Sequence, residues 1–237
     1  MPESRKSPVV PIVVAVIAAL ALAFVLAQGA LGGDDRGVDN AADVGASPTD
    51  PPAGWDQLVR RVDGDPMAVG AVDAPVVIIA YSDFQCPFCG KFARETEPVL
   101  VEKYVEDGTL RIEWRDFPYL GPESTVAARG GRAAAAQDRF WEFQRAMYAN
   151  QLPPNSGKLD EDHLMAVAKD LDLDVGRFSE DLASPVNLAA IQDDFAEGQG
   201  IGVTGTPAFI INGVPVIGAQ PLEVFEQAIE KAAQEAG

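Results

Sequence analysis

The chain has 237 residues, of which 47% are hydrophobic, so it is long enough to bury a substantial core in one large domain. A formal net charge of −18 and an isoelectric point near 4.3 oppose binding to a phosphate backbone, so we expect no nucleic-acid partner. Part of the acidity lies in local runs, at 170–174 and 193–197, which we interpret as solvated surface.

The first 31 residues predict a membrane anchor. Arg5 and Lys6 precede an apolar run at 9–27, and no further charged residue occurs before Asp34. The run is close to the ~20 residues that a spanning helix needs and longer than the usual core of a signal peptide, about 7 to 15 residues. Basic residues before the run place the N-terminus inside and the remainder outside. We predict a cytoplasmic tip and transmembrane helix at 1–31, with a cleaved signal peptide as the alternative.

A linker and one folded region are expected to follow. Residues 32–54 are rich in Gly, Asp and Pro and predict a flexible linker, which leaves 55–237 as the folded domain. The strand–helix–strand order at the start of this domain predicts a parallel pair of strands, and Pro98 predicts a kink in the helix. The dipeptide Asn212-Gly213 predicts a hairpin turn. The expected elements are a strand at 74–84, a helix at 87–106, a strand at 109–117, helices over 122–200, a hairpin at 208–217 and a helix at 221–235.

Within the helical block, aromatic residues at helical spacing are interpreted as core, not as a substrate-binding group. They are Phe140, Trp141 and Phe143. The chain's single histidine, His163, lies near a predicted helix start and is interpreted as a surface residue.

Both cysteines of the chain lie in one tetrapeptide, within the segment YSDFQCPFCGKF that joins the first strand to the following helix. Residues three apart on a helix face the same way and are compatible with a disulfide. Pro87 is favoured at the first helical position, so Cys86 is expected to cap the helix, where free amides and the helix dipole lower the pKa of a thiol. Cys89 lies one turn further and is expected to be more buried. The pattern predicts that Cys86 exchanges with substrate and that Cys89 resolves the mixed disulfide.

Three other interpretations of the cysteine pair are less favoured. A zinc site needs about four ligands, and the chain offers two cysteines and one distant histidine, so we expect no metal and no cofactor. A purely structural disulfide between residues this close would restrain little chain entropy. Two inert thiols are uncommon in the oxidising space that the N-terminal segment predicts.

The segments SDFQCPFC, RDFP and GVTGTPAFIING, in this order around a helical block, resemble the DsbA-like branch of the thioredoxin superfamily from residue 64 onward. The resemblance implies an α/β thioredoxin fold with an inserted helical subdomain. It implies that Thr206-Pro207 is a cis peptide beside the cysteines, whereas the residues alone also allow a trans proline that starts a strand. It further implies that Pro87, Phe88, Thr206 and Pro207 support the active site or contact the substrate.

The chain departs from the family pattern at two places. Many members carry a carboxylate six residues before the first cysteine, thought to relay the proton of the buried thiol, and here that position is Ala80. Asp83 is nearer to Cys86 but is interpreted as a surface or turn residue. The dipeptide Pro87-Phe88 lacks the histidine of strongly oxidising members, so we expect the thiolate to be stabilised by backbone amides.

These observations predict a membrane-anchored extracytoplasmic thiol-disulfide oxidoreductase that donates a Cys86–Cys89 disulfide to reduced exported polypeptides. By the resemblance, a quinone-linked membrane reoxidase regenerates the disulfide. A thiol-disulfide reductase or isomerase of the same compartment is the nearest alternative. A non-catalytic thioredoxin-like binding module or chaperone, with a static disulfide, is the second.

Overall fold

The structure is a computed structural model that describes residues 54–237. The predicted anchor at 1–31 and all but the last residue of the predicted linker at 32–54 lie outside the described residues. Within the described part, no helix is both long and apolar enough to cross a membrane. The elements in chain order are the 3-10 helix η1 (Trp55–Gln57), β1 (Ala68–Val69), β2 (Val76–Ser82), α2 (Pro87–Glu95), α3 (Glu97–Leu100), the π-helical turn η2 (Val101–Val105), β3 (Leu110–Asp116), α4 (Pro122–Ala135), α5 (Phe140–Ala149), α6 (Glu161–Asp170), α7 (Val175–Leu182), α8 (Pro185–Gly200), β4 (Ala208–Ile211), β5 (Val214–Ile217) and α9 (Leu222–Ala236).

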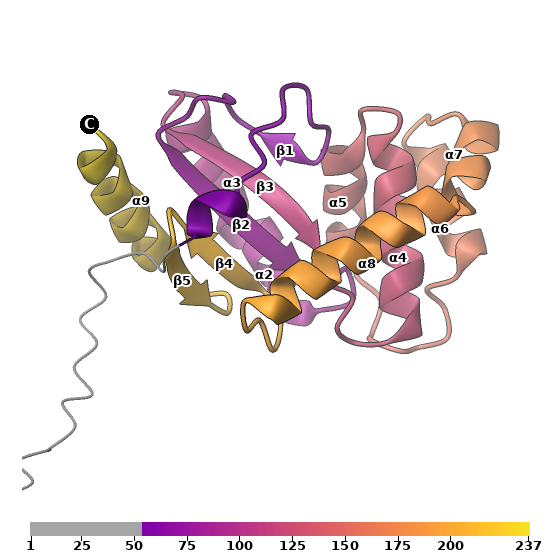
Figure 1. Ribbon diagram of the computed structural model, residues 1–237. Coiled ribbons are helices and arrows are strands. Elements are labelled where there is room, and N and C mark those ends of the chain that lie inside the picture. The colour runs from indigo at the N-terminus through magenta and orange to yellow at the C-terminus, as the bar shows by residue number, and fades with distance from the viewer. Residues whose placement is uncertain (1–53) are drawn as a thin grey trace, which may run out of the picture. The chain divides into compact units, whose positions relative to one another are not determined.

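A five-stranded sheet in the order β1-β3-β2-β4-β5 forms the centre of the fold (Figure 1). β2 and β3 are parallel, as predicted, and the other neighbouring pairs are antiparallel. Every residue of β2 is buried, which explains its continuous apolar run in place of an alternating pattern. The predicted hairpin is confirmed: Asn212 and Gly213, with φ of 43° and 87°, form the turn between β4 and β5.

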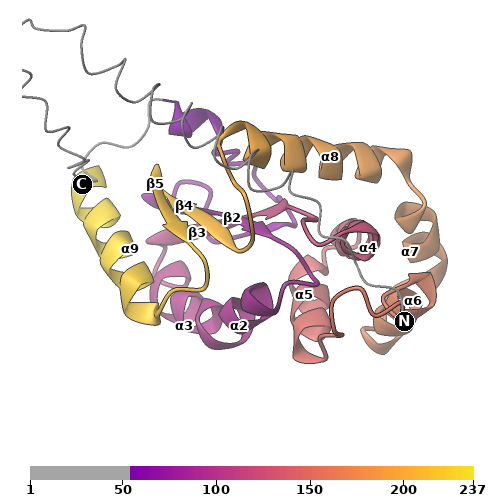
Figure 2. The ribbon, with the colours of Figure 1, turned by 90° about the horizontal axis from the view of Figure 1, so that it is seen from below.

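Helices cover both faces of the sheet (Figure 2). On one face lie α2, α3 and α9, where Phe92 contacts the rings of Phe209 and Phe225. On the other face lie η1 and α8, which pack over Tyr81 and Phe117. The strand that leads to the cysteines is therefore enclosed between two apolar layers.

The predicted helical insertion is confirmed and consists of α4 to α8, between β3 and β4. Phe140 and Phe143 are fully buried in its core, as predicted, and their rings contact Phe84 just before the first cysteine. Trp141 is partly buried against the same core. Three of the helices begin at residues whose side chains accept an N–H from three residues further on: Asp160, Asp174 and Ser184.

The single kinked helix predicted at 87–106 is divided into separate elements. α2 ends at Glu95, α3 begins at Glu97, and a π-helical turn follows. Pro98 is the cause, because it supplies no N–H and its ring clashes with the carbonyl four residues earlier.

Part of the acidity that we interpreted as solvated surface is buried and paired with arginine. Asp194, within the run at 193–197, is 1% exposed and lies 2.6 Å from Arg132 of α4. Glu113 on β3 is fully buried and lies 2.9 Å from Arg115. Arg132 also lies 2.6 Å from Asp116 of β3. Since an unpaired buried charge is expensive, the shared arginine holds α8, α4 and β3 in fixed relation.

Candidate active site

The strand β2 brings the chain to the first cysteine. Cys86 caps α2 with an extended backbone (φ −72°, ψ 119°), and Pro87 occupies the first turn, as predicted. Both cysteines are free thiols in this structure. Cys86 keeps 5% of its surface exposed and Cys89 only 1%, so the predicted order of burial is confirmed.

The surroundings of the two thiols drive their pKa values apart. The pKa of Cys86 falls to about 6, chiefly because the Cys89 thiol hydrogen-bonds to it; Thr206 and the amides of Cys89 and Phe88 add to the effect, and burial opposes it. Burial raises the pKa of Cys89 well above its usual value. At neutral pH, Cys86 is therefore a thiolate and Cys89 a thiol. The predicted depression is confirmed, whereas the expectation that backbone amides dominate is wrong.

The loop before β4 lies against Cys86. The Thr206-Pro207 peptide is cis, as the resemblance implies. When Cys86 is protonated, its thiol donates to the carbonyl oxygen of Thr206 over 3.2 Å. The hydroxyl of Thr206 has no partner within the described structure, so it is free to donate to the sulfur when Cys86 is ionised. Gly218 ties the loop to the end of β5 by donating to the Pro207 carbonyl over 2.8 Å.

Large apolar side chains are exposed close to this loop. Phe88, between the cysteines, is 64% exposed, and Ile217, which pairs with Ala208, is 65% exposed. A hollow of about 350 Å³ lies between Thr206, Pro207 and Ile217. An exposed apolar side chain such as Ile217 in the lining of a hollow is typical of a surface that receives another molecule.

Asp83 is a turn residue, but the interpretation as a surface residue is wrong. Its side chain is buried, with 2% of the residue exposed, and it accepts three backbone N–H groups. One comes from Gln85 over 2.8 Å, and the others come from Tyr119 and Leu120 over 2.8 and 2.9 Å. Asp83 therefore joins the active-site loop to the loop after β3. The local turn was visible in sequence, whereas the distant partners were not.

Ala80, at the position of the family's relay carboxylate, is buried in the sheet and 4% exposed. Glu97, at the start of α3, is a buried acid that sequence reasoning missed. Glu97 is 6% exposed, Gln144 donates to both of its carboxylate oxygens, and burial raises its pKa to about 7. The available signal was the four-residue spacing of Cys89, Ala93 and Glu97, which would place Glu97 on the buried face of the single helix predicted at 87–106.

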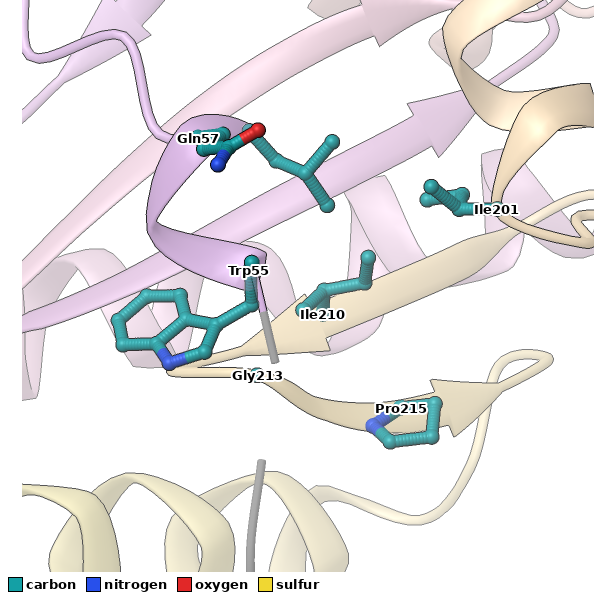
Figure 3. Close-up of a pocket in the computed structure, with 8 residues that line it drawn as sticks. Trp55, Gln57, Ile201, Ile210, Gly213 and Pro215 are labelled. Carbon is teal, nitrogen blue, oxygen red and sulfur yellow. The ribbon is translucent and has the colours of Figure 1, made fainter. Parts of the chain in front are cut away.

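A second hollow, of about 510 Å³, lies on the face of the sheet that carries η1 and α8 (Figure 3). Trp55, Leu58, Ile201, Ile210 and Pro215 contribute to its largely apolar lining, and neither cysteine does. It is therefore separate from the thiol site. Over residues 54–237, no group of three or more His, Cys, Asp or Glu side chains is placed to hold a metal ion.

Comparison with known families decides the classification. A family model described as Thioredoxin matches residues 63–231. The chain belongs to the thioredoxin family. Within that family it is similar to the "Probable disulfide bond formation protein D" of Bacillus cereus, at 31% identity over 150 residues, which are 62% of this chain and 69% of the Bacillus protein.

Another match is to part of a larger protein. The chain is 34% identical over 165 residues to the Na(+)/H(+) antiporter NhaA 1 of Salinispora arenicola. The matched segment is 69% of this chain and spans only 24% of the antiporter's length.

Solved structures share the thioredoxin fold and its helical insertion. The crystal structure of alpha-DsbA1 from Wolbachia pipientis superposes with a TM-score of 0.67 at 24% identity, covering 76% of this chain and 96% of that one. Oxidised BdbD from Bacillus subtilis superposes with a TM-score of 0.66 at 21% identity, covering 72% and 94%. The chain thus has the fold of these two structures.

Proposed function

We propose that the protein is a protein disulfide oxidoreductase that donates a Cys86–Cys89 disulfide to reduced polypeptides. The observation that carries the proposal is the pairing of a Cys86 thiolate, with a pKa of about 6, with a Cys89 whose pKa is raised by burial. A thiolate that is stable at neutral pH stabilises the reduced pair and makes the oxidised pair a stronger oxidant. The same thiolate is a good leaving group.

The exchange proceeds in two displacements. A substrate thiolate attacks Sγ of Cys86, the Cys86–Cys89 bond breaks, and its electron pair passes to Cys89, which takes up a proton because burial favours its thiol form. A second substrate thiolate then attacks the substrate sulfur of the mixed disulfide and expels Cys86 as a thiolate. The substrate loses two electrons and gains a disulfide, and the cysteine pair is reduced by the same two electrons.

The neighbouring residues have supporting roles in the proposal. Pro87 starts α2 without an N–H of its own, and its fixed φ presets the helical turn that follows the nucleophile. Thr206 and Pro207 offer backbone to an extended substrate beside Cys86. Phe88 supplies exposed apolar area for an unfolded chain.

The compartment and partners belong to the same proposal. The apolar run at 9–27, preceded by Arg5 and Lys6, anchors the protein in the cell membrane with its catalytic domain on the extracytoplasmic side. The substrates are reduced exported polypeptides, and the name of the Bacillus cereus relative supports a role in disulfide formation. Each turnover leaves two electrons on the cysteine pair, so an acceptor must remove them. A quinone-linked membrane reoxidase is the acceptor that we propose.

The reduction potential of the Cys86–Cys89 pair, measured in glutathione buffers, tests the direction of electron flow. A value between about −120 and −180 mV supports disulfide donation. A value near about −270 mV, as in thioredoxin, would make the protein a reductase. If the Cys86–Cys89 disulfide stays oxidised at potentials well below about −270 mV, the result would support a non-catalytic binding module with a static disulfide. Cys86→Ala is the matched control and abolishes exchange in the first two cases.

A further inference from the structure

A glutamine from the helical insertion contacts the active-site loop directly. Gln151 lies two residues beyond the end of α5 and is half-buried. Its side-chain Nε2 donates to the carbonyl oxygen of Phe84 and to that of Cys86, each over 2.9 Å. A carboxamide nitrogen carries two hydrogens, so both are used. The bonds cross 67 and 65 residues of sequence and reach the nucleophile itself and the residue two positions before it.

These two carbonyls determine how Cys86 meets α2. The Cys86 carbonyl accepts the first helical hydrogen bond, from Gly90 over 3.1 Å. The direction of this carbonyl therefore sets the direction of the first turn of α2. The amides of Phe88 and Cys89 that stabilise the thiolate belong to this same turn. Holding the carbonyls of Phe84 and Cys86 together fixes the bend by which the chain enters the helix. The Cys86 sulfur is thereby kept against the amides.

Gly90 provides an independent observation. It is buried inside α2, where glycine destabilises a helix relative to alanine, and it does not have a left-handed backbone that would require glycine. A Cβ at this position would clash with Oε1 of Gln151 and would lie 2.7 Å from a guanidinium nitrogen of Arg94. The missing side chain is the space in which the carboxamide lies. The absence of a side chain at Gly90 and the position of the Gln151 carboxamide therefore depend on each other.

The end of α5 is itself held against the site. Arg94 of α2 donates to the carbonyl of Tyr148 over 2.6 Å, and the Tyr148 hydroxyl donates to the carbonyl of Asp83 over 3.1 Å. With the bonds of Gln151, donors from this end of α5 reach the carbonyls on both sides of the bend. The insertion thus supplies part of the redox centre and is not only a cover for it.

We propose that Gln151 is a positioning residue for Cys86: its carboxamide fixes the turn that aims the first amides of α2 at the sulfur and stabilises the thiolate. The inference deepens the proposed function, since it concerns the nucleophile of the same reaction. The Gln151 amide places the positive end of a dipole beside Cys86, so its removal acts more strongly on the reduced, ionised form than on the disulfide.

The test compares Gln151→Leu with wild type in the full-length protein. The pH dependence of Cys86 alkylation, read by mass spectrometry, gives the pKa of the thiol, and denaturant unfolding gives the stability of each redox form. We expect the alkylation midpoint to rise by about one pH unit, a tenfold change in the ratio of thiolate to thiol, and the reduced form to lose more stability than the oxidised form. Gln151→Glu, which puts an acceptor against both carbonyls, should raise the midpoint further.

Gln137→Leu is the matched control. Gln137 also bridges distant backbone, since its carboxamide donates to the carbonyl of Asp174 over 3.1 Å and accepts from its N–H over 2.9 Å, but the bridge lies within the insertion. We expect its alkylation midpoint to equal that of wild type. If Gln151→Leu does not fold, Gly90→Ala displaces the carboxamide and should raise the midpoint while Gln151 is retained.

Two results would overturn the inference. One is an unchanged midpoint in folded Gln151→Leu or Gly90→Ala. The other is an equal loss of stability in both redox forms, which would mean a merely structural role. The midpoint reports Cys86 whatever the direction of electron flow, so a thioredoxin-like potential in wild type would refute disulfide donation without touching the role of Gln151.

Discussion

Glu97→Gln is expected to make the protein more stable, by an amount that grows with pH. Glu97 begins α3, is 6% exposed, and is held by Gln144, whose amide donates to its two oxygens over 3.2 and 3.0 Å. Burial raises its pKa from 4.5 to about 7; Gln144 and the positive charge of Arg145 oppose the rise but do not cancel it. An ionised Glu97 is therefore a cost that the folded protein carries at neutral pH.

The size of the effect follows from linkage. The folded protein binds the Glu97 proton more tightly than the unfolded chain, so the stability that this proton contributes is complete below pH 4.5 and is lost as the pH rises to about 7. A rise in pKa from 4.5 to about 7 corresponds to about 3 kcal/mol of unfolding free energy. The carboxamide introduced by Glu97→Gln would keep a donor and an acceptor in place of the carboxyl but would never ionise.

Urea unfolding of the oxidised protein measures how the contribution of Glu97 to stability changes with pH, without interference from the titration of the thiols. The difference in unfolding free energy between Glu97→Gln and wild type should be small near pH 4.5 and should reach about 3 kcal/mol, in favour of the variant, near pH 8. Glu95→Gln, at an exposed position two residues earlier, is the matched control and should show a small difference at both pH values.

A Glu97→Gln difference that stays constant between pH 4.5 and about pH 8 would refute the reasoning. It would mean that the carboxylate ionises in the folded protein as readily as in water, with a buried water or a cation compensating for its desolvation.

Two further predictions concern groups that the fold brings together. Cys89→Ala should raise the alkylation midpoint of Cys86 above about 6, because it removes the hydrogen bond that contributes most to the lowered pKa of Cys86. Cys89→Ser, whose hydroxyl still donates, should raise the midpoint less. Equal midpoints in the two variants would contradict the role given to the Cys89 hydrogen bond. Arg132→Met should cost about 3 kcal/mol of unfolding free energy in urea, because it removes the cation that lies 2.6 Å from the buried carboxylates of Asp116 and Asp194. Asp194 keeps its pair with Arg60, so the cost falls mainly on Asp116. A loss below about 1 kcal/mol would show that the carboxylates are neutralised in another way.

Features that depend on near neighbours were predictable. Pro87 predicted the start of α2 and hence the place of Cys86 at the N-terminus of this helix, because proline favours the first helical position whatever surrounds it. Asn212 and Gly213 predicted the turn between β4 and β5, since both adopt positive φ at little cost. The cis peptide at Pro207 is different, because only the family resemblance predicted it.

Features that depend on distant partners were missed. The local sequence indicates that Asp83 is a turn residue, but two of the N–H groups that bind its buried carboxylate come from 36 and 37 residues further on. The sequence around Asp194 indicates an acidic surface, but Arg132 and Arg60, 62 and 134 residues away, pair with its buried carboxylate. Whether a charged side chain is solvated depends on which partner the packing of the chain brings to it, and no local pattern contains that information.

The sequence by itself determined that the two cysteines lie close together at the beginning of a helix, because spacing and proline act over a single turn. Only the tertiary structure decided how the pair is tuned. Burial of Cys89, the approach of Thr206 to the sulfur of Cys86, and the hydrogen bonds of Gln151 to the loop all arise from segments far apart in the chain. A thiol's pKa depends on desolvation and on hydrogen-bond donors within a few ångströms of the sulfur, and only tertiary packing excludes the water and brings those donors close.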